Sequence, residues 1–238
     1  MITIVRVPAP DKMVVDAKAI TDAIVAYLKK RKAGAVDAPP SPVPAGKKPK
    51  DLELKALVSK YSDDKIGLKA HLLGETHGKC AYCESKVLHV DYGDIEHVVP
   101  KSIRPDLAVD IANLTVACGV CNTNKSDYYN AKAPLVDPHL DDCRKEVVFV
   151  GPAIVPALCG ARGQHTVREL ELNRDALSKR RADHFNKFGE VYSSWVNEKD
   201  AEMKYARLLT LWDHAEPKAE YSSMSLTALE YFKVDTIQ

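Results

Sequence analysis

The chain has 238 residues, enough for one large domain or two small ones. Its 34 basic and 33 acidic residues leave a net charge of +1, which is low for a protein that captures nucleic acid alone, because phosphate neutralisation supplies most of that affinity. Either the basic groups are clustered, or a partner supplies part of the binding surface. With no recognisable signal peptide and no apolar run near ~20 residues, the sequence predicts a soluble, cytoplasmic protein without membrane contact.

Residues 1–50 predict a strand and a helix, followed by a linker. Residues 2–7 are a strand candidate, and a helix is expected from the apolar spacing of Ala17, Ile20, Ile24, Tyr27 and Leu28. Residues 33–50 are rich in Pro and Ala, as is typical of an extended or mobile linker. Basic runs at residues 29–32, 47–50 and 179–181 are nucleic-acid contact candidates, although such runs are more often solvated surfaces.

Residues 51–137 predict the central domain, and its first helix begins after Asp51, a candidate N-cap. Two Cys-x-x-Cys pairs follow, with these members: Cys80, Cys83, Cys118 and Cys121. A two-residue gap lets both sulfurs of a pair reach one ion, so two pairs predict a closed, structural Cys₄ zinc site. The alternatives are unrelated buried thiols or a redox motif, which needs only one pair. Cys143 and Cys159 are interpreted as small core residues.

Two short strands and a helix are expected around and between the pairs. The predicted order is a strand over residues 95–99 stopped by Pro100, a loop over 100–112, a strand over 114–117, and a helix from near residue 120 that ends before Pro134. Such a unit buries little core, and structural zinc contributes ~10–16 kcal/mol of apparent binding energy. Zinc removal is therefore expected to unfold it.

Three short segments between the cysteine pairs and just after them contain polar residues that could form a site. They lie in Glu96-His97-Val98-Val99-Pro100, then Asn113-Leu114, then Cys121-Asn122-Thr123-Asn124-Lys125. Over about residues 76–135 the order resembles the HNH endonucleases of the ββα-metal fold, with Asn122 at a position often held by His. The resemblance implies an α+β protein: a zinc-stabilised ββα-metal (HNH) core with mainly helical N- and C-terminal regions.

The resemblance also implies a role for each polar residue. His97 is expected to be the general base, since an unperturbed His titrates near pH ~6.5. Glu96 and Asn122 are expected to hold a divalent cation, Mg²⁺ above all, through oxygen ligands. Asn113 is expected to brace the loop and orient His97.

Alternatives remain open for each of these positions. A single His in a strand is usually structural, Asn122 could cap a helix, and Asn113 could sit in a turn. Asp94 could replace Glu96 as the metal carboxylate, because strand alternation places Glu96 and His97 on opposite faces. Lys101 and Lys125 are further candidates, as phosphate contacts. The joint occurrence of the motif residues inside a zinc frame favours the functional interpretation.

Residues 138–238 predict a mainly helical C-terminal region. Apolar residues recur at helical spacing from Asp175 onward, and core packing is the simpler interpretation. A docking face for a partner is the alternative, with Trp212 and Tyr221 as its candidate exposed residues.

A narrower resemblance extends to about residue 185. It rests on Cys80-Ala81-Tyr82-Cys83-Glu84, Ile95-Glu96-His97, Pro100-Lys101-Ser102, Gly163-Gln164-His165-Thr166 and Leu170-Glu171-Leu172-Asn173. These segments resemble the HNH branch of retron and Septu-type anti-phage systems. The resemblance implies an effector subunit that acts beside an ABC-type ATPase, which would be a separate chain because no phosphate-binding loop motif occurs here.

The sequence therefore predicts a metal-dependent endonuclease that hydrolyses phosphodiester bonds, with DNA the favoured substrate. The alternatives are an RNase or tRNase of the same mechanism, and a zinc-stabilised nucleic-acid-binding adaptor without catalysis.

Overall fold

The computed structural model describes residues 1–238 except 2, 33–66, 88–91, 159 and 235–238. The predicted linker, the helix expected after Asp51 and Cys159 lie outside these residues. The elements are α1 (Asp11–Lys32), α3 (Leu68–Glu75), β1 (Asp94–His97), β2 (Leu114–Ala117), α4 (Gly119–Lys125), α5 (Cys143–Glu146), β3 (Val147–Val150), β4 (Ala153–Pro156), α6 (Ala161–Glu169), α7 (Asp175–Asn197), α8 (Ala201–Asp213) and α9 (Ser222–Tyr231).

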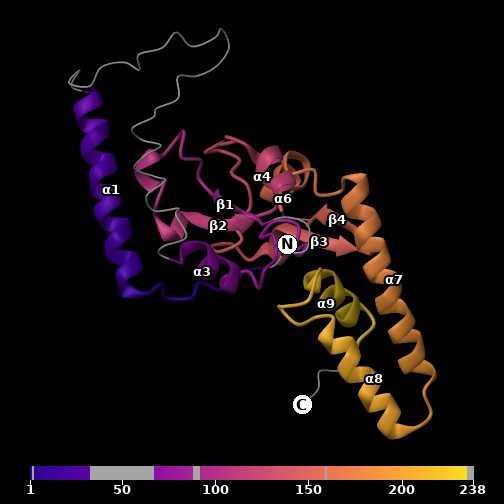
Figure 1. The fold of residues 1–238 in the computed structure, drawn as a ribbon. Coiled ribbons are helices and arrows are strands. Elements are labelled where there is room, and N and C mark those ends of the chain that lie inside the picture. Colours follow the sequence, from indigo (N-terminus) through magenta and orange to yellow (C-terminus); the bar gives the residue numbers. More distant parts are fainter. Residues whose placement is uncertain (2, 33–66, 88–91, 159, 235–238) are drawn as a thin grey trace.

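The antiparallel hairpin of β1 and β2 lies at the centre of the molecule (Figure 1). Its register pairs Asp94 with Ala117 and His97 with Leu114. All four residues of β2 are buried, and the strand predicted over residues 114–117 is confirmed with the same bounds. β1 begins one residue before the predicted strand and ends at His97, two residues before its predicted end.

The loop before β2 contains more regular structure than predicted, and the helix after β2 is confirmed. The 100–112 loop contains the 3₁₀ helix η2 (Pro105–Leu107) and leads into a second one, η3 (Ile111–Asn113). α4 begins at Gly119 and ends at Lys125, before Pro134 as predicted, because Ser126 has a φ of 47°, which cannot continue an α-helix.

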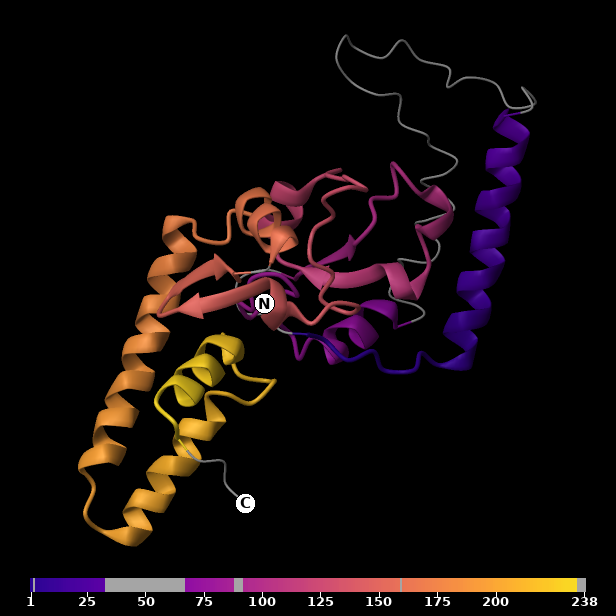
Figure 2. The ribbon, with the colours of Figure 1, turned by 180° about the vertical axis from the view of Figure 1, so that it is seen from behind.

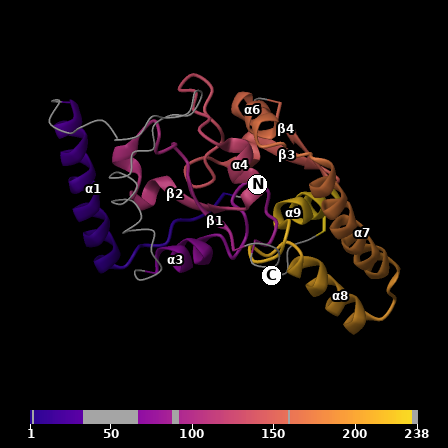
Figure 3. The ribbon, with the colours of Figure 1, turned by 45° about the horizontal axis from the view of Figure 1, so that its top comes forward.

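The N-terminal strand prediction is wrong for residues 3–7, which form no strand. The Ile4 N–H donates to the Pro138 carbonyl at 2.6 Å, and the Val7 N–H donates to the Glu75 carboxylate at 2.9 Å. These backbone donors are satisfied by a loop and a side chain, so no strand partner is needed. The helix predicted around residues 17–28 is confirmed as α1, which stands at one end of the molecule (Figure 3).

The C-terminal region contains a hairpin that the sequence analysis missed. β3 and β4 pair antiparallel, with the turn at Gly151 in a left-handed conformation (φ 56°). α6 packs against this hairpin, and Gly163 makes the approach possible. A Cβ added at Gly163 would lie 1.8 Å from the Glu146 carbonyl oxygen.

The remaining helices confirm the predicted helical character and form an arm at the other end of the molecule. α8 returns beside α7, and α9 packs between this pair and the β3–β4 hairpin (Figure 2). The arm has its own apolar cluster, which includes Phe188, Leu211 and Leu229. Tyr221 is buried, so its predicted exposure is wrong, and Trp212 is half-buried.

The basic run at residues 179–181 does not form a cationic patch. Arg181 is fully buried, and Arg180 forms an ion pair with Glu220 at 3.1 Å. Among the described residues, no helix combines the length and apolar character needed to cross a membrane.

Candidate metal centre and nuclease site

The two Cys-x-x-Cys pairs converge on one point. The four Sγ atoms of Cys80, Cys83, Cys118 and Cys121 all lie within 4.8 Å of one another. Cys83 and Cys118 Sγ are 3.9 Å apart, close to the edge of about 3.8 Å that a tetrahedron with Zn–S bonds of about 2.3 Å requires. Three of the four residues are buried. The donor set and its spacing fit a structural zinc ion.

Backbone hydrogen bonds hold each Cys-x-x-Cys pair in a turn that directs both sulfur atoms to the same side. The Glu84 N–H donates to the Cys80 carbonyl at 3.0 Å, which closes the first turn, and Glu84 has a φ of 63°. Cys118 is the N-cap of α4, and its sulfur accepts the Cys121 N–H at 3.5 Å. The first pair is joined to the hairpin because the Ala81 N–H donates to the Val116 carbonyl of β2.

β1 and α4 face each other through two polar contacts. Asn122 Nδ2 donates to Asp94 Oδ2 at 2.8 Å, and both side chains are half-buried. One turn further along α4, the Lys125 ammonium forms an ion pair with Glu96. The structure thus brings Asn122 to Asp94, the alternative metal carboxylate, and pairs Glu96 with a lysine.

The Glu96–Lys125 pair is almost completely buried, with exposed fractions of 5% and 2% for the two side chains. The Lys125 ammonium also donates to the His97 carbonyl at 2.7 Å. Burial raises the pKa of Glu96, and Lys125 acts in the opposite direction. A phosphate-contact role for Lys125 is contradicted by this burial, whereas Lys101 is exposed.

The ring of His97 is held by the loop that follows β1. Its Nε2 lies 2.9 Å from the Ala108 carbonyl oxygen, which can only accept, so Nε2 carries the proton in this contact. Nδ1 is then the basic nitrogen of the neutral ring. Burial lowers the pKa of His97 to about 4, so the ring is neutral at pH 7.

Asn113 fastens the same loop. Its Oδ1 accepts the Val99 N–H at 2.8 Å, and its Nδ2 donates to the carbonyls of Val99 and Leu107 at 3.0 and 3.2 Å. These bonds join the two ends of the loop that carries Ala108. Asn113 therefore acts on the backbone around His97, and its side-chain bonds go to Val99 and Leu107.

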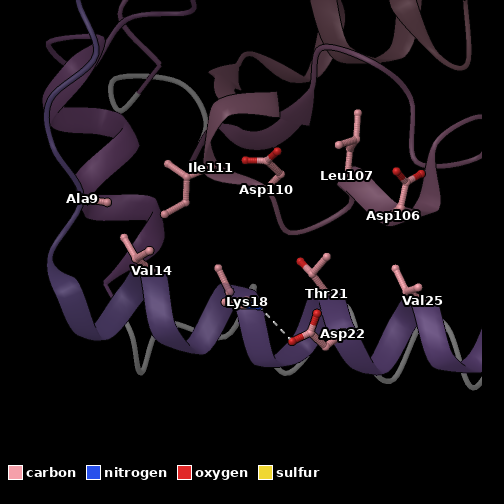
Figure 4. Close-up of a pocket in the computed structure, with 11 residues that line it drawn as sticks. Ala9, Val14, Lys18, Thr21, Asp22, Val25, Asp106, Leu107, Asp110 and Ile111 are labelled. Atoms are coloured by element: carbon pink, nitrogen blue, oxygen red, sulfur yellow. Dashed lines mark hydrogen bonds and ion pairs between the residues drawn. The ribbon is translucent and has the colours of Figure 1, made fainter.

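A separate groove of about 550 Å³ lies between α1 and the 105–111 segment (Figure 4). Three aspartates, Asp22, Asp106 and Asp110, line it, and Lys18 pairs with Asp22 at 3.4 Å. Its acidic lining is poorly suited to a phosphodiester backbone. The groove contains none of the motif residues.

The side-chain oxygen atoms of Asp94 and Asn122 also fit a divalent cation. Asp94 and Asn122 already touch, and the Asn122 amide can turn to present Oδ1 in place of Nδ2. Carboxylate and amide oxygens are ligands that Mg²⁺ accepts together with water. The roles of His97, Asn113 and Asn122 stay predictions, and sequence reasoning missed the structural role of Lys125, which depends on α4 lying along β1.

Comparisons with known proteins agree with this geometry. Residues 80–128 match the family model described as HNH endonuclease. The chain is 30% identical over 108 residues to Septu protein PtuB of Bacillus thuringiensis, covering 45% of this chain and 41% of the relative. It is 29% identical over 153 residues to Septu protein PtuB of Bacillus mycoides (strain KBAB4), covering 51% of each.

The chain thus spans about half the length of the curated relatives that it matches. The matched segment contains both cysteine pairs, the β1–β2 hairpin and α4. Residues 80–128 therefore match the HNH endonuclease family model, in a chain that is similar to Septu protein PtuB.

Proposed function

We propose that this protein is a metal-dependent endonuclease whose general base is Nδ1 of His97. The contact between His97 Nε2 and the Ala108 carbonyl is the observation that carries the proposal. It fixes the neutral tautomer in which Nδ1 can take a proton from water. The water oxygen then forms a bond to phosphorus as the bond to the 3′ oxygen breaks.

A divalent cation, Mg²⁺ above all, would polarise the phosphate and neutralise the departing 3′ oxygen. Asn122 and a carboxylate of β1 are its proposed ligands. Glu96 is the ligand that the sequence resemblance implies, and it would have to leave Lys125 to bind the ion. Asp94 already contacts Asn122. Asn113 would keep the loop, and with it the His97 ring, in place.

DNA is the proposed substrate, and the proposed setting is an anti-phage complex in the cytoplasm with a separate ABC-type ATPase subunit. The similarity to Septu protein PtuB supports this setting. The net charge of +1 also supports a partner that supplies part of the nucleic-acid surface.

Cleavage of plasmid DNA and bulk RNA by wild type and His97→Ala tests the proposal, with Mg²⁺ varied and zinc measured in both proteins. We expect both to hold one zinc and only the wild type to cut DNA. RNA cleavage alone would change the substrate class. Cleavage by the variant would refute the base assignment, and zinc-loaded wild type that cuts neither, even with its ATPase, would favour a binding adaptor.

A further inference from the structure

Arg174 contacts the cysteine cluster from a distant part of the sequence. It is the N-cap residue of α7, and its Nη1 and Nη2 atoms each donate to Cys121 Sγ at 3.7 Å. The same Nη1 lies 3.4 Å from the Leu170 carbonyl and 3.2 Å from the Glu171 carbonyl. The guanidinium is thus held by backbone acceptors of the α6–α7 connection and directed at one sulfur.

The charge of a loaded site explains why an arginine belongs here. Four thiolates around one Zn²⁺ carry two net negative charges, and burial makes such charge costly unless hydrogen bonds and cations compensate it. Arg174 supplies a cation and N–H donors to Cys121, which is fully buried. Charge-assisted N–H donors to the sulfur stabilise the thiolate that would bind the metal.

A buried arginine of α7, Arg181, also lies near the cysteine cluster. Arg181 is fully buried, and among the described residues no carboxylate forms an ion pair with it. Its Nη1 donates to the Leu172 carbonyl at 2.6 Å, and its guanidinium lies over the Phe149 and Tyr221 rings. The negative charge of the cysteine cluster is a physical reason for a cation at this depth. Arg174 is the one that touches a sulfur.

Solvent reaches the cluster from the same side. Cys118 is half-buried and lines a groove of about 460 Å³, together with Lys86, Arg174 and Arg180. A small chelator can approach the metal through this groove. Arg174 and Arg180 both line it, but Arg180 is exposed and pairs with Glu220. The chain therefore offers a matched control in the same groove.

We propose that Arg174 is a positioning residue of the zinc site: its guanidinium binds the Cys121 thiolate, offsets part of the site's negative charge and slows release of the metal. This inference concerns metal retention and holds whether or not the domain cleaves nucleic acid. It also links α7 physically to the zinc site, because the N-cap residue of the helix donates to a ligand.

The test is zinc release from the full-length protein. Wild type, Arg174→Met, Arg174→Lys and Arg180→Met are loaded, their zinc content is measured, and release into excess chelator is followed. Because changes to groups that bind metal ligands typically cost 10–100-fold in affinity, we expect roughly tenfold or greater acceleration for Arg174→Met. Arg174→Lys should be intermediate, since it keeps the charge without the planar pair of donors. Arg180→Met should match wild type.

Co²⁺ substitution separates an effect on the sulfur from a general loss of packing. Loss of the N–H donors should shift the thiolate-to-cobalt charge-transfer band in Arg174→Met but leave it unchanged in Arg180→Met. Wild-type release rates and an unshifted band in Arg174→Met would overturn the proposal, as would a wild-type protein that binds no zinc. If Arg174→Met does not fold, the Arg174→Lys release rate and band decide the same question.

Discussion

Asn122 donates a hydrogen bond to Asp94 at 2.8 Å, whereas Glu96, the carboxylate next to His97, is ion-paired with Lys125. The two carboxylates of β1 that face α4 therefore have different environments. Asp94 is half-buried beside an amide that can turn its oxygen outward, and Glu96 is buried against a fixed cation. Because their partners differ, substitutions at Asp94 and Glu96 can show which carboxylate binds the metal.

We expect Asp94→Asn to raise the Mg²⁺ concentration for half-maximal cleavage by roughly tenfold or more, since even changes outside the ligand set cost 10–100-fold. Its thermal unfolding should stay near wild type, because Asn preserves a polar partner for Asn122. Glu96→Gln is the matched comparison. If Glu96→Gln shifts the Mg²⁺ requirement and Asp94→Asn does not, Glu96 is the ligand, as the sequence resemblance implies.

Lys125→Met should destabilise the domain. The change removes the partner of a carboxylate that is only 5% exposed, and breaking a buried pair typically costs about 3–5 kcal/mol. Urea unfolding measures the loss. Lys101→Met, at an exposed position, should be neutral, and adding Glu96→Gln to Lys125→Met should restore much of the stability. Equal stability of Lys125→Met and Lys101→Met would contradict a structural role for the pair.

The contrast between Lys125 and the cysteines shows what the sequence could predict. Spacing alone predicted that the two Cys-x-x-Cys pairs converge on one point, because the ligand geometry is local within each pair. The strand over residues 114–117 was also predicted with the bounds that β2 has. The partner of Lys125 depends on how α4 crosses β1, and Arg174 is 53 residues from the sulfur that it contacts. Such tertiary contacts leave no periodic signal in the sequence.

The missed β3–β4 hairpin has a different cause. Its two short apolar runs flank Gly151 and Pro152, which is a turn signal, but they lie within a region dominated by helical spacing. The Asn173 side chain both accepts from the Ile154 N–H and donates to the Ile154 carbonyl, at 2.9 and 2.7 Å. That contact fixes the outer edge of β4 through the loop before α7, a stabilisation that local propensity does not include.

Asn113→Ala should lower cleavage and stability together. It removes three side-chain hydrogen bonds to Val99 and Leu107 in a residue that is 6% exposed, and each unsatisfied buried partner costs about 1–3 kcal/mol. Asn113→Asp keeps the acceptor for the Val99 N–H but places a carboxylate oxygen against two carbonyls. We expect it to fail as well. Unfolding curves and turnover at saturating Mg²⁺ test both variants, and an active, stable Asn113→Asp would show that the donor is dispensable.

Stability should fall as the pH decreases from about 6.5 toward about 4. Burial, followed by the charge of Arg6, lowers the pKa of His139 to about 4 from its ordinary value of 6.5. Between these values the unfolded chain binds a proton that the folded chain does not. The free energy of unfolding therefore decreases as the pH falls. His139→Gln removes this contribution and should give a shallower decline in urea midpoint from pH 7 to pH 5. An unchanged slope would exclude His139 as a source of the decline.

Glu84 should couple the zinc site to the C-terminal arm. Its carboxylate is fully buried, accepts from the Ser223 N–H at 3.1 Å and from Ser222 Oγ at 3.3 Å, and lies 3.8 Å from the Lys79 ammonium. Burial raises the pKa of Glu84, but the Met1 ammonium and Lys79 lower it by more, so the pKa is about 2. The residue is therefore ionised at neutral pH, and it follows Cys83 directly in the chain.

Glu84→Gln would leave Lys79 buried without its carboxylate, at a cost of about 3–5 kcal/mol. Because the charged acceptor of the first turn of α9 becomes a neutral amide, which accepts more weakly, hydrogen exchange should increase at Ser222 and Ser223 before it increases in β2. Glu190→Gln on the exposed side of α7 is the control and should change neither quantity. Uniform loss of protection across the domain in Glu84→Gln would indicate global destabilisation instead, and would contradict a local link between the zinc site and α9.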